Sequence, residues 1–102
     1  MKNTLYIDIS KQHIVSVKLF TAEGELVKET EQQFGSQVLL QLIQESLNEA
    51  KLTAKDLEEI LVATGPGSFT GLRVGVAIAN AFGYSLDIPV NGKKMELELQ
   101  YS

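Results

Sequence analysis

The sequence predicts an α/β domain built on a mixed β-sheet. Three segments with the alternation or the apolar content of strands come first, at residues 4–9, 13–20 and 25–33. Two segments with helical spacing follow, and each leads into a further short apolar run, at residues 60–63 and 88–90. Three strands that precede two strand-linked helices are typical of an α/β fold.

The three leading strands differ in their expected exposure. Residues 4–9 are rich in Leu, Tyr and Ile, which predicts a buried strand, whereas residues 13–20 alternate and predict a half-exposed one. Ala22-Glu23-Gly24-Glu25 is a turn with glycine at its tight position. Residues 25–33 are more polar, so we expect them to form the edge of a three-stranded meander.

The first predicted helix begins at Ser36 and runs for about 15 residues. One apolar face is formed, at helical spacing, by Leu39, Ile43, Leu47 and Ala50. Three further residues widen that face beyond what one sheet covers: Val38, Leu40 and Leu42. Thr53, with Asp56 three positions later, then predicts a capped helical turn before the strand at 60–63.

The glycine-rich segment at residues 64–75 is the most informative part of the chain. Its glycines and Pro66 predict a tight loop between a strand and a helix that runs from about Thr70 to Ser85. Ser68 or Thr70 is the candidate cap of that helix. Such a junction either holds an anion on free amides or lets the helix pack very close to a neighbour.

A contiguous stretch within this segment resembles the signature of the TsaB family, also called YeaZ. The stretch is Gly-Pro-Gly-Ser-Phe-Thr-Gly-Leu-Arg at residues 65–73, followed by the small-residue helix Val74-Gly75-Val76-Ala77. Upstream, Leu5-Tyr6-Ile7-Asp8-Ile9-Ser10 is similar to the family's first strand. Downstream, Asp87-Ile88-Pro89-Val90 is similar to the strand after the signature helix, so the resemblance spans residues 4–91.

The resemblance implies both a fold and a function. The fold is a single ribonuclease-H-like lobe of the actin and Hsp70 (ASKHA) superfamily, with a mixed sheet and helices. The implied function is that of a non-catalytic partner, which binds and supports a TsaD-type enzyme in the threonylcarbamoyl modification of tRNA adenosine (t6A). That catalytic subunit carries the nucleotide and metal, so no cofactor is expected here, and tRNA is met only indirectly. A TsaE-type ATPase is a further candidate partner, and a homodimer is expected in isolation.

A stripe of small residues recurs every fourth position of the signature helix, at Gly71, Gly75, Ala79 and Gly83. Glycine inside a helix costs about 1 kcal/mol relative to alanine, so the stripe needs a compensating close contact. It packs either on the domain's own sheet or on another chain, and the resemblance favours the second. The expected partner interface then also contains Leu72, Val76 and Phe82, with Leu39, Ile43 and Leu47 of the preceding helix.

Nucleotide motifs fit the glycine loop poorly. No lysine occurs between Lys55 and Lys93, which excludes a Walker A sequence. The dinucleotide fingerprint fits at Gly65 and Gly67, but Thr70 stands where its third glycine belongs. Asp8 and Ser10 are either remnants of a phosphate-binding turn or a pair that caps the strand end, and the second is favoured.

Other chemistry has little support. Arg73, on a helix of small apolar residues, pairs either with an acid of a partner or with one of its own lobe. The structural loop is expected to consist of Gly65, Pro66, Gly67, Ser68 and Arg73. His13 is the single histidine, so a metal site of the metallopeptidase kind lacks ligands, and no serine has a base beside it. We therefore expect no catalytic, cofactor or metal residues.

Length and charge set the remaining limits. The chain has 102 residues and a net charge of −4, with nine scattered basic residues, which argues against direct binding of free nucleic acid. It has no cysteine, and no signal peptide or membrane span is evident, so a cytoplasmic protein is expected.

The end of the chain departs from the family pattern. Residues 1–92 correspond to the first of the family's two lobes, and residues 93–102 form a divergent tail. The tail alternates apolar and polar residues from 95 to 101, which predicts an extra strand. The chain is either a natural single-lobe form or a fragment. The alternative functions are a self-associating homodimeric module, or a small anion- or nucleotide-binding enzyme that uses the loop from Gly65 to Gly71.

Overall fold

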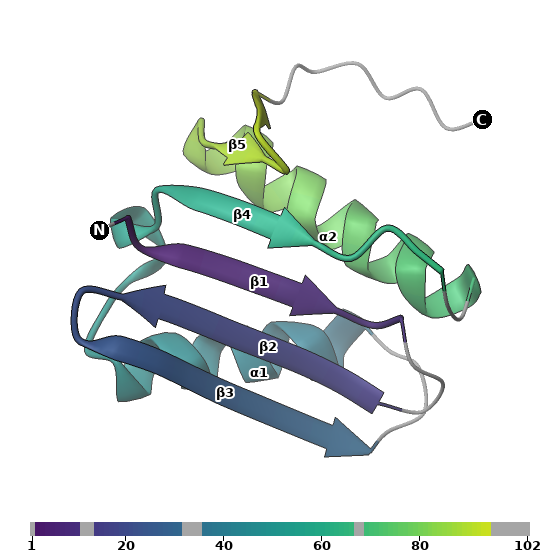
Figure 1. Ribbon diagram of the computed structural model, residues 1–102, viewed down its shortest axis with the longest axis horizontal. Helices are drawn as coiled ribbons and strands as arrows, with labels where there is room; N and C mark the ends of the chain where they lie inside the picture. The colour runs from purple at the N-terminus through teal and green to yellow at the C-terminus, as the bar shows by residue number, and fades with distance from the viewer. Residues whose placement is uncertain (1, 11–13, 32–35, 67–68, 95–102) are drawn as a thin grey trace.

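The chain folds into one six-stranded mixed sheet with two helices. The computed structural model describes residues 2–10, 14–31, 36–66 and 69–94, without the side chains of residues 36, 69, 70 and 94. The strand order is β3-β2-β1-β4-β5-β6 (Figure 1). This arrangement confirms the mixed α/β sheet that the sequence predicts.

The first three strands form the expected meander. They are β1 (Thr4–Asp8), β2 (Ile14–Thr21) and β3 (Gly24–Glu31), and both pairings are antiparallel. Gly24 has a φ of 133°, a backbone region that favours glycine, and it forms the predicted tight turn. β3 is the outer strand on its side of the sheet, as its polar sequence predicts.

The second half of the chain extends the sheet on the other side of β1. Helix α1 (Ser36–Glu49) and the 3-10 turn η1 (Ala54–Asp56) lead to β4 (Glu59–Val62), which pairs with β1 in parallel. Thr53 and Asp56 form the predicted capping box. Helix α2 (Phe69–Leu86) then leads to β5 (Pro89–Val90), which is parallel to β4. β6 (Lys93–Lys94) turns back antiparallel to β5, and the rest of the predicted tail strand lies outside the described residues.

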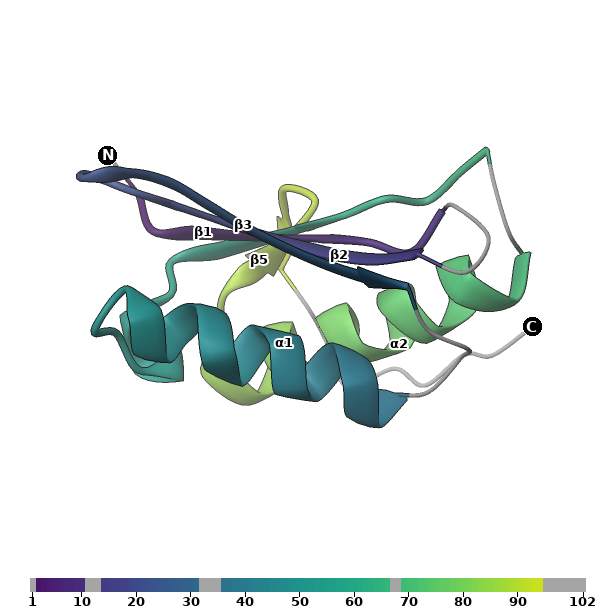
Figure 2. The ribbon, with the colours of Figure 1, turned by 90° about the horizontal axis from the view of Figure 1, so that it is seen from below.

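Both helices cover the same face of the sheet (Figure 2). Strand side chains alternate, so one side of β1, β2 and β4 points at the helices and is almost completely buried. The core between sheet and helices is formed by Leu5, Ile7, Val17, Leu19, Ile60 and Val62 from the strands and by Leu39, Ile43, Leu47 and Ala79 from the helices. In the part of the chain that the structure describes, no helix covers the opposite face.

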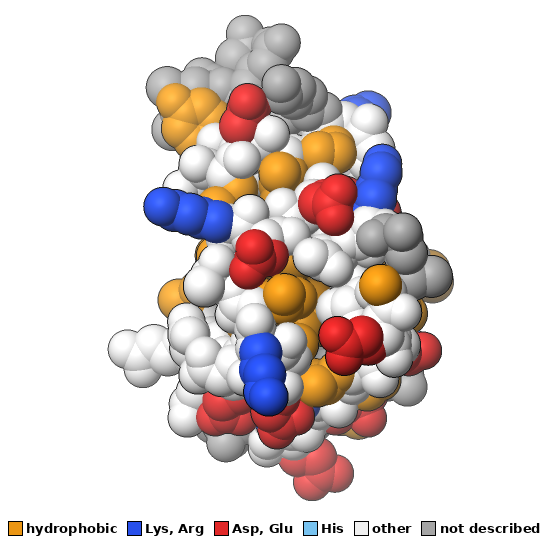
Figure 3. All heavy atoms as spheres, turned by 90° about the vertical axis from the view of Figure 1, so that its left-hand side faces the viewer, with side chains coloured by type: hydrophobic (Ala, Val, Ile, Leu, Met, Phe, Trp, Pro, Cys, Tyr) orange, Lys and Arg blue, Asp and Glu red, His pale blue; other side chains and the backbone are white. Residues whose placement is uncertain are grey.

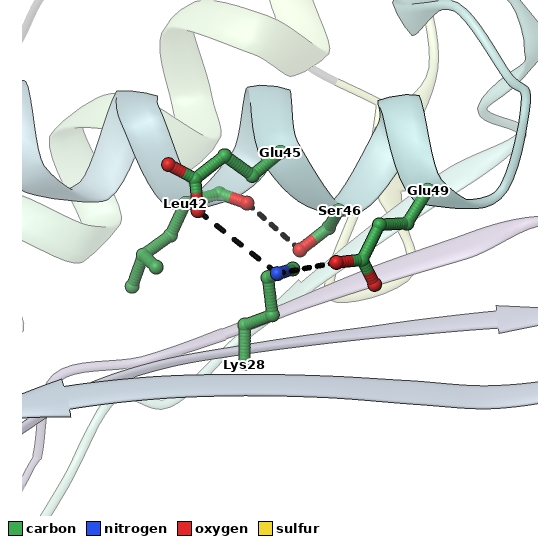
Figure 4. Close-up of polar contacts among 5 residues, drawn as sticks. All are labelled: Lys28, Leu42, Glu45, Ser46 and Glu49. Carbon is green, nitrogen blue, oxygen red and sulfur yellow. Dashed lines mark hydrogen bonds and ion pairs between the residues drawn. The ribbon is translucent and has the colours of Figure 1, made fainter.

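One polar contact ties β3 to α1 (Figure 4). The Nζ atom of Lys28 lies 2.7 Å from Oε1 of Glu49 and 4.0 Å from Oε1 of Glu45. The hydrogen bond to Glu49 raises the pKa of Lys28; desolvation opposes this, and the charges of Glu49 and Glu45 add to it. Within α1, the buried hydroxyl of Ser46 donates to the carbonyl oxygen of Leu42 at 2.7 Å. Both acidic residues of α1 are therefore directed toward the sheet.

A side chain replaces strand pairing where β5 ends. Val62 N–H donates to Oδ1 of Asn91 at 2.8 Å, and Nδ2 of Asn91 donates to the Val62 carbonyl at 3.1 Å. Asn91 has a φ of 51°, in a region that asparagine tolerates better than most residues. The Asn91 amide therefore fixes the end of β4, from which the glycine-rich loop departs.

Candidate partner interface

The glycine-rich loop forms the predicted junction between strand and helix. It leaves β4 after Val62 and enters α2 at Phe69. Gly65 has a φ of 138°, which favours glycine, and the peptide bond between Gly65 and Pro66 is cis. Gly67 and Ser68 lie outside the described residues, so the predicted capping role of Ser68 stays a prediction.

The small-residue stripe of α2 faces the sheet of its own domain. A Cβ atom on Gly71 would lie 2.3 Å from the carbonyl oxygen of Ile9 and 2.7 Å from its Cγ2 atom. A Cβ atom on Gly75 would lie 3.5 Å from side-chain atoms of both Ile7 and Val62. The backbone of α2 therefore lies directly against β1 and β4. This close packing compensates for the free-energy cost of glycine in the helix.

This packing agrees with the first of the two interpretations of the stripe, contact with the domain's own sheet. Gly71, Gly75, Ala79 and Gly83 are all buried within the single chain, and their predicted contact with another chain stays a prediction. The same holds for the three predicted residues of α1: Leu39, Ile43 and Leu47 are at most 3% exposed and belong to the core. Small size at these positions serves the contact between helix and sheet.

The outer surface of the two helices is nearly uncharged. Among the charged residues of α1, Glu45 and Glu49 bind Lys28, and α2 has one charged residue, Arg73. Apart from Glu49, Arg73 and Ser85, the exposed residues of the two helices are small, amide or apolar: Gln37, Leu40, Gln41, Gln44 and Asn48 on α1, and Ala77, Asn80, Ala81 and Tyr84 on α2. We call these nine residues the neutral helix surface.

Two apolar side chains are the most conspicuous members of the neutral helix surface. Leu40 is 44% exposed and Tyr84 is 49% exposed. Leu72, Val76 and Phe82, which were predicted for the interface, are half-buried, and that prediction stays untested for them. Depletion of charge around exposed apolar and aromatic side chains is typical of the centre of a protein–protein interface. This surface could have been predicted from the distribution of charge along the two helices, whereas the small-residue stripe indicates a different face of α2.

Asp8 and Ser10 form a local turn at the end of β1. One carboxylate oxygen of Asp8 accepts hydrogen bonds from the backbone N–H and from the hydroxyl of Ser10. This is the capping arrangement that was favoured over a phosphate-binding remnant. Ile9, between them, packs against Gly71 and brings the start of α2 onto the strand end.

The other candidate sites offer no set of converging ligands. In residues 2–10, 14–31, 36–66 and 69–94, no group of three His, Cys, Asp or Glu side chains could hold a metal ion. His13 lies outside those ranges, and Arg73 is exposed on α2, where its partner stays a prediction. No described helix is long and apolar enough to cross a membrane.

An open hollow of about 280 Å³ lies where β2 turns into β3, beside the end of α1. Figure 3 shows this end of the molecule, with apolar side chains exposed between scattered charged ones. Aliphatic side chains line part of it, with Leu19, Leu26 and Leu52 among them, and the rest of the lining includes Asn3, Thr21, Glu23 and Glu25. The hollow is open at the turn, whereas a small-molecule site usually buries most of its ligand.

Comparison with known proteins gives a consistent family match. The family model described as "TsaD: tRNA N6-adenosine threonylcarbamoyltransferase" matches residues 9–92. The tRNA threonylcarbamoyladenosine biosynthesis protein TsaB of Bacillus subtilis (strain 168) is 49% identical over 45 residues, which cover 44% of this chain and 20% of that protein. The TsaB protein of Haemophilus influenzae is 31% identical over 86 residues, which cover 84% of this chain and 36% of that protein.

A solved structure shares the fold. YeaZ from Pseudomonas aeruginosa superposes with a TM-score of 0.82 at 27% sequence identity. The match covers 88% of this chain and 42% of the YeaZ chain. This chain therefore spans less than half the length of the relatives that it matches.

Proposed function

This chain belongs to the family described as TsaD, tRNA N6-adenosine threonylcarbamoyltransferase, and to its TsaB (YeaZ) members, and from that premise we propose that it is a non-catalytic partner in the biosynthesis of threonylcarbamoyladenosine in tRNA. In this role it binds a TsaD-type catalytic subunit, in the cytoplasm, and a TsaE-type ATPase is a further partner of the same assembly. It meets tRNA only through these proteins, because its net charge of −4 disfavours direct contact with phosphates.

The observation that carries this proposal is the neutral helix surface. Two helices pack side by side on one face of the sheet, and their outer side carries few of the charges that usually cover an exposed helix, with Arg73 as the one charged residue of α2. Leu40 and Tyr84 supply apolar anchors, while Ala77 and Ala81 let the backbone of a partner helix approach. Such a surface favours a protein partner over a charged small substrate.

Substitution of the two outward alanines tests the proposal. Ala77→Glu and Ala81→Glu each place a carboxylate and extra volume on the neutral helix surface, while costing the helix only a few tenths of a kcal/mol. The variants and the wild type are co-purified with the TsaD homologue of the same source, and affinity is measured by titration calorimetry. We expect roughly a tenfold or greater loss of affinity for both variants.

Ala22→Glu is the matched control, because Ala22 is exposed in the turn between β2 and β3, outside the neutral helix surface. The control is expected to bind as the wild type does. Binding that is equally strong in all three variants would assign the interface elsewhere. No binding by the wild-type chain would contradict the partner role itself.

A second copy of this chain is the alternative occupant of the same surface. Sedimentation of the wild type alone distinguishes the two possibilities: a dimer that Ala77→Glu converts to a monomer would favour the self-associating module. An enzyme that uses the glycine loop would instead hydrolyse ATP without a partner. We expect no hydrolysis above background, because the loop lacks the lysine of a Walker A sequence and Gly71, in the first turn of α2, is packed directly onto Ile9.

A further inference from the structure

The face of the sheet opposite the helices has a chemistry of its own. Figure 1 looks onto this face, with the helices behind it. Because strand side chains alternate, every second residue of β1, β2, β3 and β4 lies on it. Its residues are independent of the neutral helix surface, which lies on the other side of the molecule.

A row of side chains crosses this face from strand to strand. The register pairs Tyr6 with Leu61 on one side and with Lys18 on the other, and Lys18 pairs with Val27. Val27 is 47% exposed and Leu61 is 36% exposed, which makes both conspicuous among the aliphatic residues. The Nζ atom of Lys18 lies 5.9 Å from the centroid of the Tyr6 ring, so the centre of the row holds one ammonium group beside an aromatic ring, between the two exposed aliphatic side chains. We call these four residues the transverse row.

Carboxylates border the transverse row on both sides. The neighbouring row on this face lies two residues along each strand from the transverse row. In that row Thr4 pairs with Glu59, and Phe20 pairs with Glu25. In the row two residues from the transverse row in the opposite direction, Ser16 pairs with both Asp8 and Glu29. The three rows thus contain four carboxylates and a single ammonium group.

We propose that this face is a docking surface for a cationic amphipathic helix of a partner protein. The apolar side of that helix packs on the aliphatic and aromatic side chains of the transverse row, and its lysines or arginines reach the carboxylates on both borders. The partner is a different one from the TsaD-type subunit, or a different segment of it, because the two surfaces lie on opposite sides of the sheet.

The spacing of the rows suits a helix. Two residues along a strand advance about 6.7 Å, so the two acidic borders lie about 13 Å apart. A helix with its side chains is about 10–12 Å wide, which places flanking cationic groups near both borders. The transverse row spans three intervals between strands, or about 14 Å, which corresponds to roughly nine helical residues.

Charge argues against the other occupants. A second copy would present the same carboxylates, and like charges across an interface are unfavourable. Nucleic acid and anionic membranes are repelled by the same carboxylates. A cationic helix instead gains both burial of apolar surface and complementary charge.

A labelled probe peptide tests the proposal. The lysine probe is a helix of about 14 residues with leucines on one face and lysines on both flanks. The glutamate probe is the same peptide with glutamate in place of every lysine. Fluorescence anisotropy measures binding to the wild type and to a variant with Val27→Thr and Leu61→Thr together, which keeps residues suited to strands. We expect the lysine probe to bind the wild type, and to bind the variant roughly tenfold more weakly.

Two controls make the test specific. Leu40→Gln removes an exposed leucine from the neutral helix surface and is expected to leave probe affinity unchanged. Glu29→Lys is expected to weaken the lysine probe and to strengthen the glutamate probe, whereas Glu23→Lys, in the turn beyond these rows, changes neither appreciably. A wild-type NMR titration reports the site without any substitution, since shifts should centre on the transverse row.

Several results would overturn the proposal. One is no binding of the lysine probe up to about 1 mM, and another is equal binding of both probes. Equal losses for the double threonine variant and Leu40→Gln, or NMR shifts centred on the helices, would also contradict it. A self-associated wild type that the double threonine variant dissociates would assign the face to a second copy.

Discussion

Two glycines one turn apart on α2 should respond in opposite ways to the same substitution. Gly71→Ala adds a Cβ atom 2.3 Å from the carbonyl oxygen of Ile9, a backbone atom that cannot rotate away. Overpacking of this kind costs about 1–3 kcal/mol, because helix and strand must separate. Gly75→Ala adds a Cβ atom whose nearest neighbours are at 3.5, 3.5 and 3.7 Å, which is ordinary van der Waals contact. Alanine there should instead stabilise by about 0.5–1 kcal/mol, the ordinary gain over glycine in a helix.

Thermal unfolding measured by circular dichroism separates the two. In a domain of this size each kcal/mol shifts the Tm by about 4–8 °C. Gly71→Ala should therefore lower the Tm by several degrees or more, and Gly75→Ala should raise it slightly. A wild-type Tm for Gly71→Ala, or equal losses for both variants, would refute the close contact between α2 and β1 that buries the small-residue stripe.

Three further predictions follow from other contacts. Ala79→Leu should destabilise by about 1–3 kcal/mol in urea unfolding, since Ala79 is 0% exposed, whereas Ala77→Leu should be tolerated; equal effects would contradict the orientation of α2. Asn91→Gly keeps the positive φ but loses two hydrogen bonds to Val62, so the unfolding free energy should fall by about 1–2 kcal/mol, and an unchanged urea midpoint would show that these bonds contribute nothing. Because the pKa of Lys28 is raised in the folded state, the ion pair adds stability below about pH 10.5, and this stability is lost as the pH rises through the folded-state pKa. The loss should be absent in Lys28→Met and weak at high salt. Identical curves of unfolding free energy against alkaline pH for wild type and variant would contradict it.

The order and the approximate limits of the elements could be predicted because each has a local signal. Alternation defines the strands, Thr53 with Asp56 defines the capped turn, and Gly24 and Gly65 occupy the backbone conformations that favour glycine. The nine-residue signature at 65–73 added the family, and with it the sheet topology. These signals need no knowledge of which surfaces are buried.

The interface could not be predicted in the same way, because a small-residue stripe reports only that something approaches closely. The groups that approach the stripe are the carbonyl of Ile9 and the side chains of Ile7 and Val62. They come from segments that are distant from α2 in the sequence. Likewise, the apolar width of α1 suggested two buried sides. Leu42 joins the core at 8% exposure and Leu40 is left outside, because one side of α1 packs on the sheet and the other does not.

Charge then distinguishes the two free sides of the domain better than hydrophobicity does. Both sides expose a few large apolar residues: Leu40 and Tyr84 over the helices, and Val27 and Leu61 over the sheet. The helix side leaves them in neutral surroundings, whereas the sheet side places them between carboxylates such as Glu29 and Glu59. A neutral surface can be buried without desolvating charge, which suits a permanent partner, while an acidic border costs free energy on burial unless cations meet it. The two proposals together predict that two protein partners bind the domain at once without competition, and that binding on the sheet side alone weakens steeply as ionic strength rises.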